Sequence, residues 1–232
     1  LFTEMVTTGA LLHGEQTDLL DFNDCEHPVA LQLVGNDPAA MAECAAMAEA
    51  SGYDEVNINV GCPSDRVQKG AFGACLMREP QLVAACVKAM QAVCSIPVTV
   101  KTRTGIVLKD APDEYSNLDF LFRLVDTLVE SGCQRLYLHA RVAVLEGLSP
   151  AQNRDIPPLT PEKGEAIKLR HPDLELILNG GITHLANALA PMTWADGIMI
   201  GRAAYHRPRF LSELEQNLYD KDFRIDESAI FD

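Results

Sequence analysis

With 232 residues, 47% of them apolar, the chain can bury one sizeable core, which favours a single α/β domain over two small ones. The net charge of −14 indicates a water-soluble protein, and the lack of a long apolar run or a charged-then-apolar leader excludes membrane and secretory proteins. We therefore expect no membrane partner and a cytoplasmic location, or another reducing compartment inside the cell.

Apolar runs alternate with helical patterns along the whole chain, which predicts repeated βα units and a parallel sheet. The seven expected strands are Phe2–Val6, Val29–Leu33, Val56–Val60, Val98–Lys101, Leu136–His139, Glu175–Leu178 and Gly197–Ile200. The expected helices are Pro38–Ser51, Glu79–Val93, Leu118–Ser131 and Pro161–Arg170. Two longer connections, Val107–Asn117 and Val142–Leu159, are expected to overhang the carboxyl ends of the strands.

Two arrangements of such units compete, an open doubly wound sheet and a closed (β/α)8 TIM barrel. No G-x-G-x-x-G run follows an early strand, as a dinucleotide-binding open sheet requires. Polar side chains instead stand at strand ends, where barrel enzymes carry their active sites: Gln32, Asn59, Lys101, His139, Asn179 and Arg202. We therefore expect a TIM barrel over residues 1–214 that is one strand short, followed by an acidic tail over residues 215–232.

One cysteine stands apart in the run from Asn57 to Met77, NINVGCPSDRVQKGAFGACLM. Cys62 follows a short apolar strand that Gly61 and Pro63 end, so its thiol is expected in a strand-to-loop corner. Catalytic residues concentrate on such loops, so we interpret Cys62 as reactive rather than as a packing residue. The other six cysteines fit reduced thiols with packing roles, and since no zinc-type spacing occurs, no metal site is predicted.

Two glycine-rich corners late in the chain suit an anion. Asn179-Gly180-Gly181 and Gly201-Arg202 follow the last two expected strands. Barrels often bind a phosphate there through uncovered backbone N–H groups, and an arginine adds a charge-assisted hydrogen bond. The alternative is that both corners are only tight turns.

Three other polar strand ends suit a ring-shaped ligand. Lys101 holds a cation where a structural lysine would normally turn outward, so it resembles a partner for an electron-rich or anionic ring atom. Gln32 offers both a donor and an acceptor. His139 lies among the same polar ends, although a lone histidine is more often a hydrogen-bonded core residue.

Eight runs of this sequence, in family order, resemble the FMN-dependent tRNA-dihydrouridine synthases and most closely their A-type branch. The runs are TEMVTTGALLHG, HPVALQL, YDEVNINVGCPSDRVQKGAFGACLM, PVTVKTRTGI, LHAR, GLSPAQNRDIPPL, LNGGI and DGIMIGRAAYHRP. The resemblance implies a TIM barrel that binds FMN, takes electrons from NADPH and reduces uridines of the tRNA D-loop, at position 20 or 20a, to 5,6-dihydrouridine. It also implies that hydride adds to C6 of the uracil while Cys62, as general acid, protonates C5. A thiol suits this role because it is protonated at neutral pH and is a stronger acid than serine.

The same resemblance implies roles for the other site residues, with tRNA and NADPH as partners. Flavin-ring contacts are expected from Gln32, Lys101 and His139, and phosphate contacts from Asn179, Gly180, Gly181, Gly201 and Arg202. Substrate contacts are expected from Asn59 and from four arginines on loops of the same face: Arg66, Arg103, Arg141 and Arg154.

Several features depart from the family pattern. The opening strand with its Ala-Pro-Met motif is absent, residues 215–232 would be at most the start of the family's C-terminal helical tRNA-binding domain, and Val142-Ala143-Val144 stands where Lys-Ala-Trp is usual. The 33 acidic against 19 basic residues also oppose a polyanion. A non-catalytic relative with a structural or interaction role is therefore an alternative, as is another FMN barrel of the dihydroorotate dehydrogenase type. The retained Cys62, Lys101 and His139 favour the synthase, and GLSPAQNRDIPPL argues against the second alternative.

Overall fold

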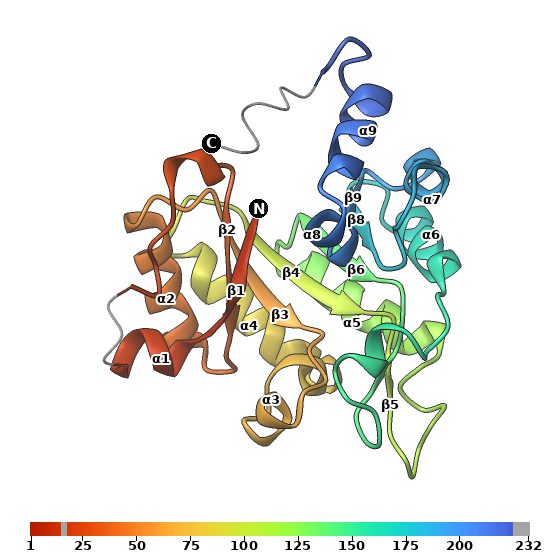
Figure 1. Ribbon diagram of the computed structural model, residues 1–232. Coiled ribbons are helices and arrows are strands. Elements are labelled where there is room, and N and C mark those ends of the chain that lie inside the picture. Colours follow the sequence, from red (N-terminus) through yellow and green to blue (C-terminus); the bar gives the residue numbers. More distant parts are fainter. Residues whose placement is uncertain (15–17, 225–232) are drawn as a thin grey trace.

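The computed structural model describes residues 1–14 and 18–224 (Figure 1). Its main sheet has seven parallel strands that lie side by side in chain order. They are β1 (Phe2–Thr7), β2 (Ala30–Val34), β3 (Glu55–Val60), β4 (Val98–Arg103), β6 (Arg135–His139), β8 (Glu175–Asn179) and β9 (Gly197–Met199). All seven predicted strands are confirmed, with small shifts at their ends.

Helices follow most strands and cover one side of the sheet (Figure 1). The four predicted helices are confirmed as α2 (Pro38–Ala50), α4 (Pro80–Gln91), α5 (Leu118–Glu130) and α6 (Pro161–Arg170), each packed against the next. Consecutive parallel strands with helices outside them give the predicted α/β architecture of a TIM barrel. In the described ranges no helix combines the length and the apolar character needed to cross a membrane.

Shorter helical elements were not predicted. The α-helices are α1 (Thr8–His13), α3 (Asp65–Lys69), α7 (Leu185–Leu189), α8 (Arg202–His206) and α9 (Arg209–Leu218). The 3-10 turns are η1 (Asp24–Glu26), η2 (Gly73–Arg78), η3 (Gln152–Arg154) and η4 (Ala190–Thr193). The expected domain boundary after residue 214 lies inside α9, and the division of the chain into domains stays a prediction.

The two faces of the sheet differ because successive residues of a strand point to opposite sides. In β3, Val56, Ile58 and Val60 join the hydrophobic core between the sheet and the helices. The alternate residues of β3 are polar yet equally buried, and they face the interior of the curled sheet. Because β4 and β6 continue this alternation in register, polar side chains from neighbouring strands meet on the inner face.

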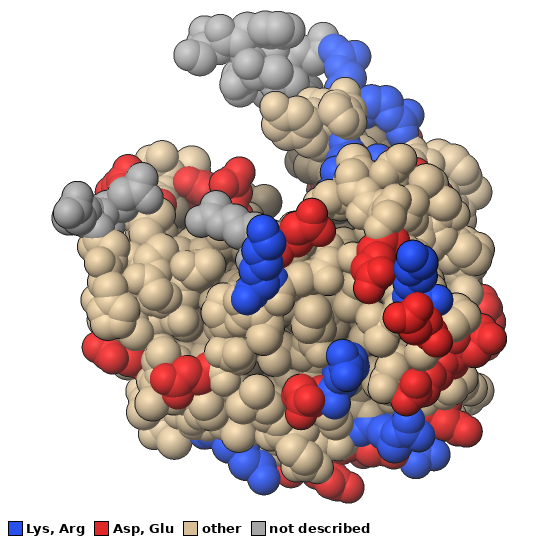
Figure 2. Space-filling model, turned by 90° about the horizontal axis from the view of Figure 1, so that it is seen from below, with Lys and Arg blue, Asp and Glu red and all other residues tan. Residues whose placement is uncertain are grey.

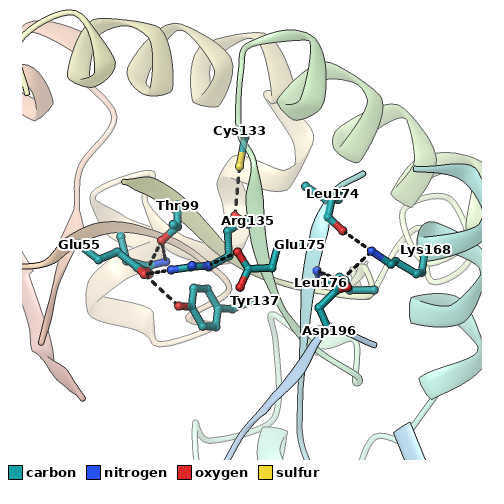
Figure 3. Close-up of polar contacts among 11 residues, drawn as sticks. Glu55, Thr99, Cys133, Arg135, Tyr137, Lys168, Leu174, Glu175, Leu176 and Asp196 are labelled. Atoms are coloured by element: carbon teal, nitrogen blue, oxygen red, sulfur yellow. Dashed lines mark hydrogen bonds and ion pairs between the residues drawn. The ribbon is translucent and has the colours of Figure 1, made fainter. Parts of the chain in front are cut away.

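Charged side chains close the amino-terminal end of this inner face (Figure 3). The Arg135 guanidinium donates from Nη1 to Glu55 Oε2 and from Nε to Glu175 Oε2, both at 2.7 Å. Tyr137 donates its hydroxyl to Glu55 Oε2 at 3.1 Å. Burial, and then the negative charge of Glu55, raise the pKa of Tyr137, so the phenol keeps its proton.

Loops at the opposite end form a second, two-stranded parallel sheet, in which β5 (Ile106–Val107) pairs with β7 (Ala143–Val144). Asn153 of η3 fastens this sheet, because its Oδ1 accepts from Val144 N at 2.7 Å and its Nδ2 donates to Val144 O at 2.9 Å. The loop that follows β7 is thereby held over the carboxyl ends of the main strands, as predicted.

Candidate functional site

A cavity of about 640 Å³ opens where the main strands end. Its lining comes from the strand ends, from the loop after β7 and from the start of α8. Eleven of the predicted site residues belong to this lining: Asn59, Cys62, Lys101, Arg103, His139, Arg154, Asn179, Gly180, Gly181, Gly201 and Arg202. Parallel strands in chain order bring these distant positions together, while their individual roles stay predictions.

Cys62 lies in the corner that follows β3, and local hydrogen bonds fix its backbone. Asn59 Oδ1 accepts from Gly61 N at 3.0 Å and from Cys62 N at 2.9 Å. The Cys62 carbonyl accepts from Ala74 N at 3.0 Å. Gly73 permits this approach, because a Cβ there would lie 2.6 Å from the Cys62 carbonyl oxygen. The half-buried thiol donates to Ser64 Oγ across 3.4 Å, and it faces the cavity.

Lys101 and His139 differ in protonation state on the cavity wall. In the described part of the chain the Lys101 ammonium has no hydrogen bond or ion pair. Burial, and then the nearby Arg103, lower the pKa of Lys101 to about 8. Burial and the surrounding cations lower the pKa of His139 to about 2, so its imidazole is neutral at physiological pH. The wall therefore presents one titratable cation and one neutral ring.

Arg103 is buried and its guanidinium braces the loops around the cavity. Nε donates to the carbonyl of Gly61 at 2.9 Å, and Nη1 donates to those of Val142 at 3.1 Å and Asn153 at 2.9 Å. One side chain thus ties the Cys62 corner to the second sheet and to η3. Burial lowers the pKa of Arg103 to about 10, which leaves it charged at neutral pH.

The two glycine corners form the far wall of the cavity. Gly180 and Gly181 have φ values of +111° and +69°, which favour glycine. A Cβ at Gly180 would lie 2.6 Å from His139 Cδ2. At Gly201 a Cβ would meet nothing within 4 Å, so the backbone there is open to a ligand. Asn179 joins the two corners, since its Nδ2 donates to Met199 O at 2.7 Å.

Arg202 lies beside these glycines with its guanidinium already paired. It donates to both carboxylate oxygens of Asp155, at 3.2 and 2.7 Å. This ion pair lowers the pKa of Asp155. The corner thus offers open backbone and an arginine that an anionic ligand would share with Asp155.

Two predicted site residues lie outside this lining, and the side chain of a third is not among those described. Gln32 is buried beneath the cavity, and both ends of its amide bond other side chains. Arg141 lies outside the lining and donates from Nη1 to the carbonyls of Asp155, at 3.3 Å, and of Pro157, while its buried Nε has no partner in the described residues. The backbone of Arg66 belongs to α3, but its side chain lies outside the described part of the molecule.

Several lining residues were not singled out in the sequence. Asp155, Thr183, His206, Arg207 and the methionines at 5 and 199 also face the cavity. For Asp155 a signal existed, because it directly follows Arg154 in the overhanging connection. Met5 and Met199 carry no such signal, since a methionine on a strand is ordinarily a core residue.

The family model described as dihydrouridine synthase matches residues 1–229. The tRNA-dihydrouridine(20/20a) synthase of Pseudomonas syringae pv. tomato is 54% identical over 220 residues, which cover 94% of this chain and 63% of that protein. The proteins of that name from Shewanella oneidensis and Escherichia coli K12 are 53% and 52% identical, over 94% of this chain and 63% and 62% of their own lengths. The chain therefore spans less than two thirds of each of these relatives.

Proposed function

This chain belongs to the dihydrouridine synthase family, and we propose that it forms the catalytic barrel of an enzyme that reduces uridine in tRNA to 5,6-dihydrouridine. The relatives' names support position 20 or 20a as the target. One observation carries the proposal: a thiol, an unpaired ammonium and a neutral imidazole share one cavity with an open glycine corner.

The cavity fits a flavin mononucleotide. Its phosphate would lie on the open backbone at Gly201, with Arg202 as the charged donor. Lys101 would face an electron-rich edge of the ring, because this ammonium has no other partner in the described residues. His139 would offer a neutral surface beside it. The bound flavin would supply hydride for C6 of the uracil, with NADPH as the electron source.

Cys62 would complete the reduction by protonating C5 of the uracil. Its Sγ donates to Ser64 Oγ at 3.4 Å, and because a thiol is a weak donor, the proton would be redirected towards a substrate in the cavity. Arg103 holds the Cys62 corner through the Gly61 carbonyl, which restrains the backbone beside the thiol. The target base must leave its stack to reach this point.

Binding of tRNA must rely on local charge. Figure 2 shows one face of the molecule with basic and acidic side chains interspersed, and the chain as a whole carries a net charge of −14. Arg154 lies at the cavity and Arg141 near it, and the positive charges of both help lower the pKa of His139. Such local charge can attract a polyanion despite the average. We therefore propose these two arginines, rather than a uniform basic surface, as contacts for the RNA backbone.

The test separates flavin binding from proton donation. Purified Cys62→Ala and Cys62→Ser protein should keep flavin absorbance and NADPH-dependent bleaching, since neither change touches the glycine corner. Dihydrouridine formation on tRNA that lacks the modification should fall at least about 100-fold, the usual contribution of a general acid. Cys25→Ser is the matched control, because Cys25 is an exposed free thiol outside the cavity.

Unchanged dihydrouridine formation in Cys62→Ala would remove Cys62 from the mechanism. A wild-type protein that never binds flavin would instead favour the non-catalytic alternative. A flavin-loaded protein that oxidises dihydroorotate and leaves tRNA untouched would favour the dihydroorotate dehydrogenase type.

A further inference from the structure

Buried polar side chains form a continuous hydrogen-bonded chain along the inner face of the sheet. It begins at Glu55, where Oε1 accepts from the Thr99 hydroxyl at 2.6 Å (Figure 3). Thr99 Oγ1 in turn accepts from Asn57 Nδ2 at 2.8 Å, and Asn57 Oδ1 accepts from Gln32 Nε2 at 2.8 Å. At most 7% of each of these residues is exposed. Water therefore has little access to these groups, and each depends on its neighbours for its hydrogen bonds.

The series of hydrogen bonds ends at the loop of the proposed proton donor, Cys62. Gln32 Oε1 accepts from Asn59 Nδ2 at 2.9 Å, and Asn59 Oδ1 accepts from the backbone N–H groups of Gly61 and Cys62. The second Asn59 N–H points to Met5 Sδ at 3.1 Å. Both lone pairs of Asn59 Oδ1 are thus used by the Cys62 corner, and its amide holds the backbone that carries the thiol.

The two ends of this hydrogen-bonded series impose the same orientation on the side-chain amides between them. A carboxylate can only accept, so Thr99 must donate to Glu55 and must accept from Asn57. Each amide then presents its oxygen to the next amide nitrogen until Asn59 presents Oδ1 to the two backbone N–H groups. A reversed Asn59 would point its N–H groups at those of Gly61 and Cys62, a clash of donors.

We propose that Glu55 and Thr99 are positioning residues for Cys62, because they fix the orientation of the Asn57, Gln32 and Asn59 amides that support its loop. The inference deepens the proposed function, since it rests on Cys62 as the proton donor. It also gives Gln32 and Asn59 a supporting task besides any ligand contact.

The ion pairs around Glu55 provide a matched control. Glu175 bonds the same Arg135 as Glu55 does, at the same end of the sheet (Figure 3). Its carboxylate has no bond to Thr99, so Glu175→Gln weakens the charged cluster and leaves the amide chain intact. A variant at Glu175 therefore reports a general destabilisation of this end of the sheet, whereas a variant at Thr99 also reports a loss of amide orientation.

The experiment compares Thr99→Val, Thr99→Ser and Glu175→Gln with the wild type. Alkylation of each thiol by iodoacetamide is followed by peptide mass spectrometry, with exposed Cys25 as the internal reference. Thr99→Val keeps the shape of the side chain but interrupts the series of hydrogen bonds. We therefore expect Cys62 to be alkylated about fivefold faster, the factor that corresponds to one neutral hydrogen bond. Thr99→Ser keeps the hydroxyl and should restore the wild-type rate, and Glu175→Gln should leave it unchanged.

An unchanged Cys62 rate in Thr99→Val would overturn the inference, as would equal acceleration in Glu175→Gln or a failure of Thr99→Ser to restore the rate. If Thr99→Val does not fold, NMR of the wild type decides. A strong Overhauser contact between the Cys62 backbone N–H and the Asn59 Nδ2 hydrogens would show the reversed amide and overturn the inference, whereas contacts from those hydrogens to Gln32 support it. None of these measurements requires turnover, so they test the support of the Cys62 loop separately from the proposed synthase activity.

Discussion

Raising the pH through 8 should weaken flavin binding, because Lys101 loses its proton in that range. Burial and Arg103 lower the pKa of Lys101 from the usual 10.5 to about 8. The ammonium is therefore charged below this pH and neutral above it. If only the charged form pairs with the flavin ring, the binding-competent fraction falls about tenfold between pH 7 and pH 9, equivalent to about 1.4 kcal/mol.

Fluorescence titration of the flavin-free protein with FMN measures this dependence at pH 7, 8 and 9. Lys101→Arg should bind with the same affinity at all three values, because a guanidinium keeps its charge. Lys101→Met should bind weakly at all three. A wild-type affinity that stays constant from pH 7 to pH 9 would refute the assignment of Lys101 to the flavin, as would a fall that persists in Lys101→Met.

Three further changes test other parts of the site. Gly73→Ala places a Cβ 2.6 Å from the Cys62 carbonyl oxygen at a φ of +61°; we expect the free energy of unfolding in urea to fall by more than about 1 kcal/mol, and an unchanged midpoint would contradict this. Arg103→Met leaves three carbonyl groups without their donor. Urea unfolding should show a loss of about 2–4 kcal/mol in the free energy of unfolding, whereas a loss under about 1 kcal/mol would show that these hydrogen bonds contribute little. His139 has a folded pKa near 2 against 6.5 when unfolded, so the unfolded chain gains a proton first as the pH falls, and the free energy of unfolding should decrease below pH 6.5 by up to about 1.4 kcal/mol per unit. His139→Gln should remove that part of the slope, and parallel curves for the two proteins would disprove the shift.

Much of the fold could be predicted from the sequence because its periodic signals are long. Five-residue apolar runs alternating with helices of ten residues or more leave few arrangements other than consecutive parallel strands. The second sheet could not be predicted in this way. Its strands have two residues each, too few for any periodicity, and Asn153 from a later turn holds them in place.

The site could be predicted where the position of a residue at a strand end alone places it in the cavity lining. Lys101 and Asn59 are register partners and line the cavity, as expected of polar residues at the ends of neighbouring strands. Gln32 is register partner to Asn57 instead, two residues before Asn59, so its side chain lies one layer deeper. Arg103 lines the cavity as expected, and its contact with substrate stays a prediction. Its hydrogen bonds to three backbone carbonyls could not be predicted, because backbone acceptors have no sequence signal.

If Arg202 holds the phosphate of the proposed cofactor, its ion pair with Asp155 makes cofactor loading a competition between two anions. An incoming phosphate must share the guanidinium with a carboxylate that already holds it, 2.7 Å away. More than half of each side chain is exposed, so added salt screens this pair as well as the attraction for phosphate. The two effects oppose each other, so loading should depend on ionic strength less steeply than the nearby cations alone suggest. Inorganic phosphate competes for the same guanidinium, and preparations made with and without it should differ in the amount of flavin they retain.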